Sequence, residues 1–211
     1  MTPIVDEHPS PIADAVRFFS ALYAGQTGIL ELRTVPLSQS AEHRILAGRL
    51  RTFIPVVDGK FAVNPIARFM RETHTRRMPA YFGVALRTQS AVKDRKGDRG
   101  HCHWLTAFYV DADFKLLGEV ETRRRLAEFP LPPSIIVNSG GGLHLYWLLR
   151  TPLDLQRDYP GAQSILRRLA KGVAGIADIV ASEPARVLRI PGSLNFKKDY
   201  DPPRVVTLEH I

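Results

Sequence analysis

Cysteine is almost missing from this sequence of 211 residues, in which Cys102 is the only one. A single cysteine excludes an intramolecular disulfide and a cysteine-rich zinc module, and we therefore expect a cytoplasmic protein. Long apolar runs are missing too, since none approaches the roughly 20 residues that a membrane-spanning helix needs. The N-terminal stretch MTPIVDEHPSP carries acids and prolines in place of the apolar core of a signal peptide. We expect neither a membrane span nor secretion.

Internal repeats and low-complexity segments are also missing. Hydrophobic residues make up 45% of the chain and charged residues 24%, which is typical of a folded globular protein. The length fits one large domain or two small lobes that share a core. Lys and Arg number 29 against 21 Asp and Glu, a formal net charge of +8. This surplus indicates a polyanionic partner, either a nucleic acid or an acidic membrane surface.

Residues 1–87 have the pattern of an α/β lobe. Ser10 is a suitable N-cap, Pro11 suits the first helical position, and Gly25 ends the helix that they begin. The other elements that we expect here are a strand over 28–35, a helix beginning at 64–65 and a strand over 79–86.

Residues 88–103, TQSAVKDRKGDRGHCH, are polar and basic with little periodicity. They predict a loop between two lobes. Its cations are the best candidates for contact with the phosphates of a template strand, because the loop stands next to an acidic motif in the sequence. These candidates are Lys93, Arg95, Lys96 and Arg99.

Residues 104–211 predict the element order β-α-β-β-α-β. The expected strands cover 105–112, 134–138, 143–150 and 187–190, with an edge strand over 204–208, and the helices cover 118–129 and 155–173, the second interrupted near Pro160. This order is that of a ferredoxin-like or RNA-recognition-motif sheet, with one face covered by helices and one face open. The whole chain is therefore expected to be α+β with two lobes.

Asp111 and Asp113 end the strand LTAFYVDAD. Residues i and i+2 of a strand point to the same side, so both carboxylates share one face. Two adjacent carboxylates repel each other unless a cation intervenes, and their hard oxygen atoms suit Mg²⁺ or Mn²⁺. The alternative is a pair of solvated acids where a strand meets a loop.

A glycine-rich turn, Ser139-Gly140-Gly141-Gly142, precedes the strand that contains His144. If Leu143 and its alternate neighbours face the helices, His144 shares the open face with Asp111 and Asp113. Backbone N–H groups of a turn such as Ser139 to Gly141 can approach a phosphate closely. The alternative is a half-buried histidine beside a turn.

The segment ARVLRIPGSLNFK, residues 185–197, supplies cations after the last helix. Arg189 alternates with apolar neighbours, and Asn195 and Lys197 follow a Pro-Gly turn, so the three could bind a triphosphate. A basic surface hairpin is the alternative. Upstream, Asp178 could supply a third carboxylate, with Glu183 as the competing candidate.

Taken together, YVDAD, SGGGLH and a downstream Asp followed by RIPGSLNFK resemble the catalytic motifs of the archaeo-eukaryotic primase superfamily, in particular the primase-polymerases of plasmids, phages and related mobile elements. The strand AYFGVALR extends the resemblance, which covers residues 81–197. It implies that one catalytic domain spans 1–211. It also implies two Mg²⁺ or Mn²⁺ ions on Asp111, Asp113 and Asp178, and a nucleotide bound by Ser139, Gly141, His144, Arg189, Asn195 and Lys197.

The function that follows is template-dependent synthesis or extension of primers from nucleoside triphosphates by two-metal phosphoryl transfer. A DNA template or primer and nucleoside triphosphates are the expected partners, with a helicase or accessory domain, fused or separate, and no membrane. Two alternatives remain from other classes: a non-catalytic nucleic-acid-binding module on the same kind of sheet, and a two-metal nuclease.

Overall fold

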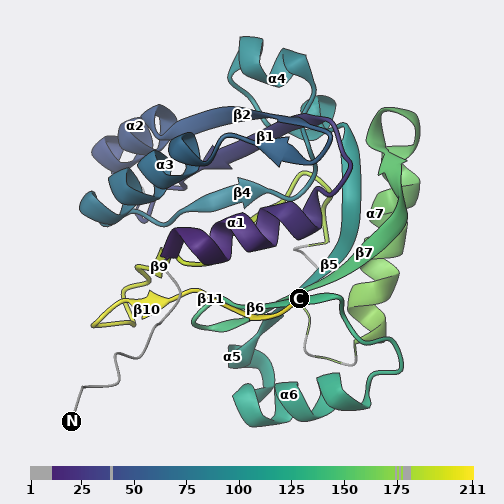
Figure 1. The fold of residues 1–211 in the computed structure, drawn as a ribbon. Helices are drawn as coiled ribbons and strands as arrows, with labels where there is room; N and C mark the ends of the chain where they lie inside the picture. Colours follow the sequence, from purple (N-terminus) through teal and green to yellow (C-terminus); the bar gives the residue numbers. More distant parts are fainter. Residues whose placement is uncertain (1–10, 39, 174, 176, 178–181) are drawn as a thin grey trace, which may run out of the picture.

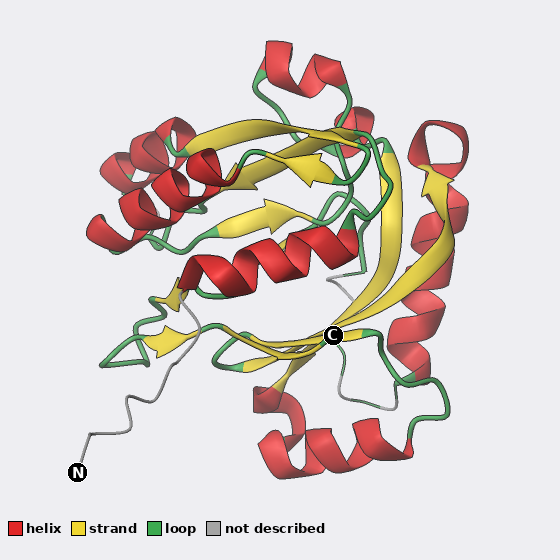
Figure 2. Cartoon of the chain, viewed as in Figure 1, coloured by secondary structure: helices red, strands yellow, loops and turns green. Residues whose placement is uncertain are grey.

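The computed structural model describes residues 11–38, 40–173, 175, 177 and 182–211 (Figure 1). Helices and strands are interspersed along this part of the chain, and its strands form two larger antiparallel sheets and one small hairpin (Figure 2). This is the α+β class that the sequence predicts. None of the described helices is long and apolar enough to cross a membrane.

The first sheet has the strand order β3-β2-β1-β4-β8. The strands and the helices beside them are α1 (Pro11–Leu22), β1 (Gly28–Arg33), α2 (Ala41–Arg49), β2 (Arg51–Val57), β3 (Lys60–Phe61), α3 (Val63–Thr75), β4 (Tyr81–Gly83) and β8 (Val187–Arg189). The predicted helices and strands of this lobe are present, whereas α2, β2 and β3 were not predicted. The α2 helix buries none of its residues, so its sequence carries no apolar stripe by which to recognise it.

The second sheet has the order β11-β6-β7-β5. Its strands and helices are β5 (Trp104–Asp113), α5 (Phe114–Leu117), α6 (Glu119–Glu128), β6 (Ile135–Asn138), β7 (Gly142–Asp154), α7 (Leu155–Gly172) and β11 (Thr207–His210). The chain kinks at Asp158, two residues before Pro160, as the predicted interruption of this helix requires. The remaining hairpin joins β9 (Leu194–Asn195) and β10 (Arg204–Val205).

Two expectations about strands and loops were wrong. Residues 187–190 were expected in the second sheet, but β8 pairs with β4 in the first sheet, and β11 is the fourth strand of the second. The expected loop over 88–103 holds helix α4 (Gln89–Asp94) and a short 3₁₀ helix (Arg99–His101). The chain thus returns to the first sheet before it completes the second, a crossing that periodicity along the sequence does not reveal.

One face of the second sheet packs on helices, as the alternation of side chains predicts. Val110, Leu145 and Trp147 belong to a buried cluster that also contains Leu126 of α6 and Val173 just after α7. This placement fixes the direction of every other side chain on β5 and β7, because successive residues point to opposite faces.

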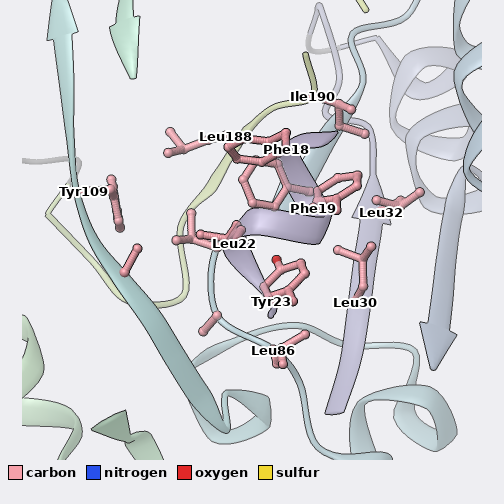
Figure 3. Packing of buried hydrophobic residues seen from close by; sticks show 14 of the residues in the cluster. Phe18, Phe19, Leu22, Tyr23, Leu30, Leu32, Leu86, Tyr109, Leu188 and Ile190 are labelled. Atoms are coloured by element: carbon pink, nitrogen blue, oxygen red, sulfur yellow. The ribbon is translucent and has the colours of Figure 1, made fainter. Parts of the chain in front are cut away.

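The opposite face was expected to be open, and in the structure it is largely covered. Helix α1 lies between the two sheets, and the ring of Phe18 is 5.2 Å from both Phe82 of β4 and Tyr146 of β7. Figure 3 shows Phe18 and Phe19 directed between Tyr109 on β5 and Leu30 on β1. One hydrophobic core therefore runs through both sheets, and polar groups on this face are accessible only where the cover ends.

A buried ionic network crosses the first sheet. The Glu31 carboxylate on β1 is fully buried; its Oε2 accepts a hydrogen bond from Arg87 Nε at 2.9 Å, and Arg51 Nε lies 3.2 Å from Oε1. The equally buried Arg87 guanidinium donates to Cys102 Sγ at 2.6 Å and to the carbonyl of Ala185 at 3.3 Å. Arg87 thus ties this sheet to the segment that leads into β8.

Candidate active site

The pairing of β5 with β7 brings two of the predicted motifs together. Asp111 stands opposite His144 in the ladder, and Asp113 stands opposite Gly142. His144 Nε2 lies 3.8 Å from Asp111 Oδ1. The acidic motif and the glycine-rich motif therefore form one site at the end of these strands.

The two carboxylates of Asp111 and Asp113 remain partly accessible. The Asp111 side chain is 25% exposed. Asp113 begins helix α5, where its Oδ1 accepts a hydrogen bond from the backbone N–H of Lys115 at 2.9 Å. Each carboxylate has two oxygen atoms, so this cap leaves further lone pairs for a ligand. Accessible carboxylates on one strand face are a suitable donor set for Mg²⁺ or Mn²⁺.

His144 is buried, with 2% exposure, and its Nδ1 has no hydrogen-bond partner among the described residues. Burial, together with the smaller effect of the positive charges of Arg189, Arg186 and Lys197, lowers the pKa of His144 to about 3. The imidazole is therefore neutral at physiological pH. The same observation shows that the cations of the downstream motif act on His144.

Arg189 reaches this site from the first sheet. It pairs with Tyr81 in the β4–β8 ladder, and its guanidinium lies 5.2 Å from the centre of the Tyr81 ring. Arg189 is 9% exposed, and its Nε has no partner in the described part of the chain. A buried guanidinium nitrogen without an acceptor is available for an anionic ligand.

The glycine turn is held by hydrogen bonds of its own. The Ser139 N–H and hydroxyl both donate to the carbonyl of Gly142, at 2.8 and 3.1 Å. A Cβ on Gly142 would lie 2.2 Å from the Ala112 carbonyl, and one on Gly141 would lie 2.3 Å from the Tyr200 hydroxyl. Glycine is required at Gly142 because the backbone of β5 passes so close.

Asn195 and Lys197 have different environments, although the sequence groups them. Asn195 is fully buried, and its amide donates to the carbonyl of Ser139 at 2.8 Å and accepts from the N–H of Lys197 at 3.2 Å. Asn195 therefore holds the glycine turn against β9, a contact that the sequence did not predict. The Lys197 side chain is half-buried, and its positive charge is one of three in this segment that lower the pKa of His144.

Three solved structures share this arrangement of elements. The AEP domain of a cyanophage S-2L primase-polymerase matches with a TM-score of 0.61 and 14% identity, over 93% of this chain and 88% of that one. A primase RepB′ matches with a TM-score of 0.59 and 13% identity, over 95% of this chain and 56% of that one. The catalytic domain of primase RepB′ in complex with initiator DNA matches with a TM-score of 0.53 and 12% identity, over 93% of this chain and 85% of that one.

The fold is that of an archaeo-eukaryotic primase domain. No family model and no curated protein matches the sequence. At these identities the likeness shows the fold alone. The resemblance drawn from short motifs is confirmed at that level, and the roles of individual residues within the primase fold stay predictions.

The third carboxylate is placed only in part. Asp178 lies outside the described residues, but its neighbour Ala177 pairs with Ala112, which stands between Asp111 and Asp113. Glu183, the competing candidate, accepts hydrogen bonds from the side chains of two α7 residues, Tyr159 and Gln163. Within the part of the primase fold that is described, no three His, Cys, Asp or Glu side chains form a metal-binding group. Glu183 supports α7 and does not join the Asp pair.

The basic loop is near the Asp pair in sequence but not in the primase fold. Lys93, Arg95 and Lys96 are exposed around α4, which lies at the opposite end of β5 from α5 in Figure 1. Seven strand steps from Trp104 to Asp111 correspond to roughly 23 Å. The fourth cation, Arg99, lies 4.5 Å above the ring of Tyr159. Any contact of this loop with a template would be several nucleotides from the Asp pair.

Sequence reasoning missed two residues of the site. Tyr81 is directed toward it: burial raises the pKa of the Tyr81 hydroxyl, and the charges of Arg189 and Asp111 also act on it. Arg186 acts on both Tyr81 and His144. The signal for Arg186 was its position three residues before Arg189, whereas Tyr81 could be found only through the pairing of β4 with β8.

Proposed function

We propose that this chain is a template-dependent DNA primase-polymerase, a nucleotidyltransferase that makes or extends primers from nucleoside triphosphates. The observation that carries the proposal is the meeting of Asp111 and His144 on paired strands with Arg189 from the other sheet. Carboxylates beside buried cations suit a reaction in which charge on a transferred phosphoryl group must be neutralised from several sides. The likeness to a phage primase-polymerase domain and to a primase that binds initiator DNA supports it.

Asp111 and Asp113, with Asp178, are the residues that would hold two Mg²⁺ or Mn²⁺ ions. When bound, such ions activate a primer 3′-hydroxyl and neutralise the leaving pyrophosphate. The residues of this chain would then bind and orient the nucleotide. Neutral His144 can donate an N–H to a phosphate oxygen, and Arg189 and Lys197 can add charge-assisted hydrogen bonds. Ser139 and Gly141 would support this contact from the turn.

The two other classes are less well supported. A binding module on such a sheet stacks bases on exposed aromatic rings, but Tyr109 and Tyr146 on the central strands are 1% and 0% exposed. A nuclease would need the carboxylates but would have no use for the triphosphate contacts of Arg189 and Lys197. Lys93, Arg95, Lys96 and Arg99 remain the proposed template contacts, at a distance from the chemistry.

The deciding assay is incubation with a template, a primer, labelled nucleoside triphosphates and Mg²⁺ or Mn²⁺. We expect extension by the wild type, and its loss in Asp111→Asn and Asp113→Asn with DNA affinity unchanged, because the carboxylates serve the ions and not the DNA backbone. Asp154→Asn is the matched control: Asp154 also ends a strand and caps the next helix, accepting from Gln156 N–H at 2.9 Å. Degradation of the primer, or extension by the double variant, would refute the proposal.

A further inference from the structure

A hollow of about 320 Å³ lies behind the downstream motif. It opens between the start of α1, the C-terminal half of α3 and the β9–β10 hairpin, which adjoin in Figure 1. Its walls are largely apolar and include the side chains of Ile12, Met70, Met78, Leu194, Phe196 and Val205. Cavities of this size and character hold small molecules or single groups of larger ones.

Two arginines lie at the mouth of this hollow. Arg71 on α3 lines it beside His74, and the Arg77 guanidinium lies 5.5 Å above the Phe196 ring, which is 9% exposed. Arg71 and His74 are exposed. The backbone carbonyl of Arg71 accepts a hydrogen bond from the Thr75 hydroxyl, whereas the Arg71 side chain has no ion pair or hydrogen bond among the described residues. An apolar hollow with arginines at its mouth suits a nucleobase and its phosphate, because the walls take the base and the guanidinium groups take the anion.

The hollow and the candidate active site share one wall. Leu194 of β9 and Phe196, which follows β9, face the hollow, whereas Asn195 between them faces the glycine turn and donates a hydrogen bond to the carbonyl of Ser139. Lys197, which follows, acts by charge on His144. A DNA strand bound in the hollow would therefore lie within a few residues of the side chains that we propose as nucleotide contacts.

We propose that this hollow binds an unpaired nucleotide of single-stranded DNA, with its base among the apolar side chains that line the hollow and its phosphate on Arg71 and Arg77. The inference deepens the proposed function, because it names where the DNA strand is gripped. The apolar walls accept a base of any identity, since every base has an aromatic face. The cationic mouth favours DNA over an apolar segment of a protein.

The test uses two variants that should keep the fold. Arg71→Glu combined with Arg77→Glu reverses the charge at the mouth of the hollow. Ala67→Trp fills the hollow with a large side chain from α3. The matched control is Arg167→Glu with Arg168→Glu, which changes the net charge equally on α7, where both residues are exposed. Affinity for fluorescent oligo(dT) is measured by anisotropy without metal or nucleotide. Loss of the contacts of one base corresponds to about 5- to 150-fold weaker binding, and we expect this in the first two variants only.

Photo-cross-linking of oligo(dT) that carries 5-iododeoxyuridine locates the strand independently. We expect adducts on Met70, His74 or Phe196. The inference would be overturned by adducts that are confined to other segments. It would also be overturned if the arginine reversal and Ala67→Trp bind DNA as tightly as the charge control. So would a change of oligomeric state in Ala67→Trp with unchanged DNA affinity, because the occupant would then be a second copy. A wild type that binds DNA here but never extends primers would refute only the proposed function.

Discussion

Replacing Glu31 by Gln removes one negative charge from between three guanidinium groups. The carboxylate is fully buried, Arg87 is fully buried beside it, and the Arg51 side chain is 17% exposed. Arg33 lies 3.9 Å away and is half-buried. Removing one partner of a buried ion pair costs about 3–5 kcal/mol, because the other charge is left uncompensated. Because Arg87 is fully buried, its charge cannot be solvated by water when Glu31 is replaced. We therefore expect a loss of stability within this range.

In a protein of this size such a loss lowers Tm by about 6–20 °C. Urea unfolding followed by circular dichroism measures the loss in the free energy of unfolding. A second pair of variants isolates the cause: Arg87→Met with Glu31→Met should be less destabilised than the sum of the two single changes, since the double variant leaves neither charge of this pair buried alone. Glu31→Gln within 1 kcal/mol of wild type, or strict additivity in the Met cycle, would refute the reasoning.

Two further predictions concern the clamp and the basic loop. Arg189→Ala and Lys197→Ala should raise the KM for nucleotide about 10- to 100-fold, because each removes a charge-assisted contact, while DNA affinity measured by anisotropy stays within twofold; the reverse pattern would assign these cations to the template. The His101 imidazole donates hydrogen bonds to the carboxylates of Asp94 and Asp98, which raise the pKa of His101. The stabilisation from these contacts is therefore complete below pH 6.5, the ordinary pKa, and is lost as pH rises through the raised value. His101→Gln should therefore lower Tm more at pH 5.5 than at pH 8.5, and an equal loss at both would contradict this linkage.

The sequence predicted the elements that carry regular apolar patterns. Alternation along residues 105–112 and 143–150 placed Val110, Leu145 and Trp147 on the helix-covered face, and the cluster of α6 and α7 confirms it. The same alternation placed Asp111 and His144 on a common face, and the β5–β7 register shows them as direct partners. These inferences rest on the backbone's period of two, which tertiary structure does not alter.

The sequence could not predict which strands pair when they lie far apart along the chain. The pattern of residues 187–190 describes a buried strand, but nothing in it says which sheet accepts that strand, and the structure pairs it with Tyr81 and its neighbours. Closeness in sequence does not mean closeness in the fold for Lys93, because an extended strand carries the chain far from α4 before Asp111 is reached. Asn195 was predicted as a nucleotide contact from its residue type, and its burial and its hydrogen bond to the Ser139 carbonyl, which the sequence did not predict, make it a support of the turn as well.

The site depends on strand register in two sheets at once. A slip of one residue between β5 and β7 would bring His144 opposite an apolar residue of the other face. Gly142 opposes such a slip, since only a residue without Cβ lets the Ala112 carbonyl approach as it does. The β4–β8 pairing sets Arg189 over Tyr81 independently. Helix α1 joins the two sheets through contacts of Phe18 with both. The packing of this helix therefore fixes the distance between the carboxylates and the cations, so a core residue remote from the chemistry controls its geometry.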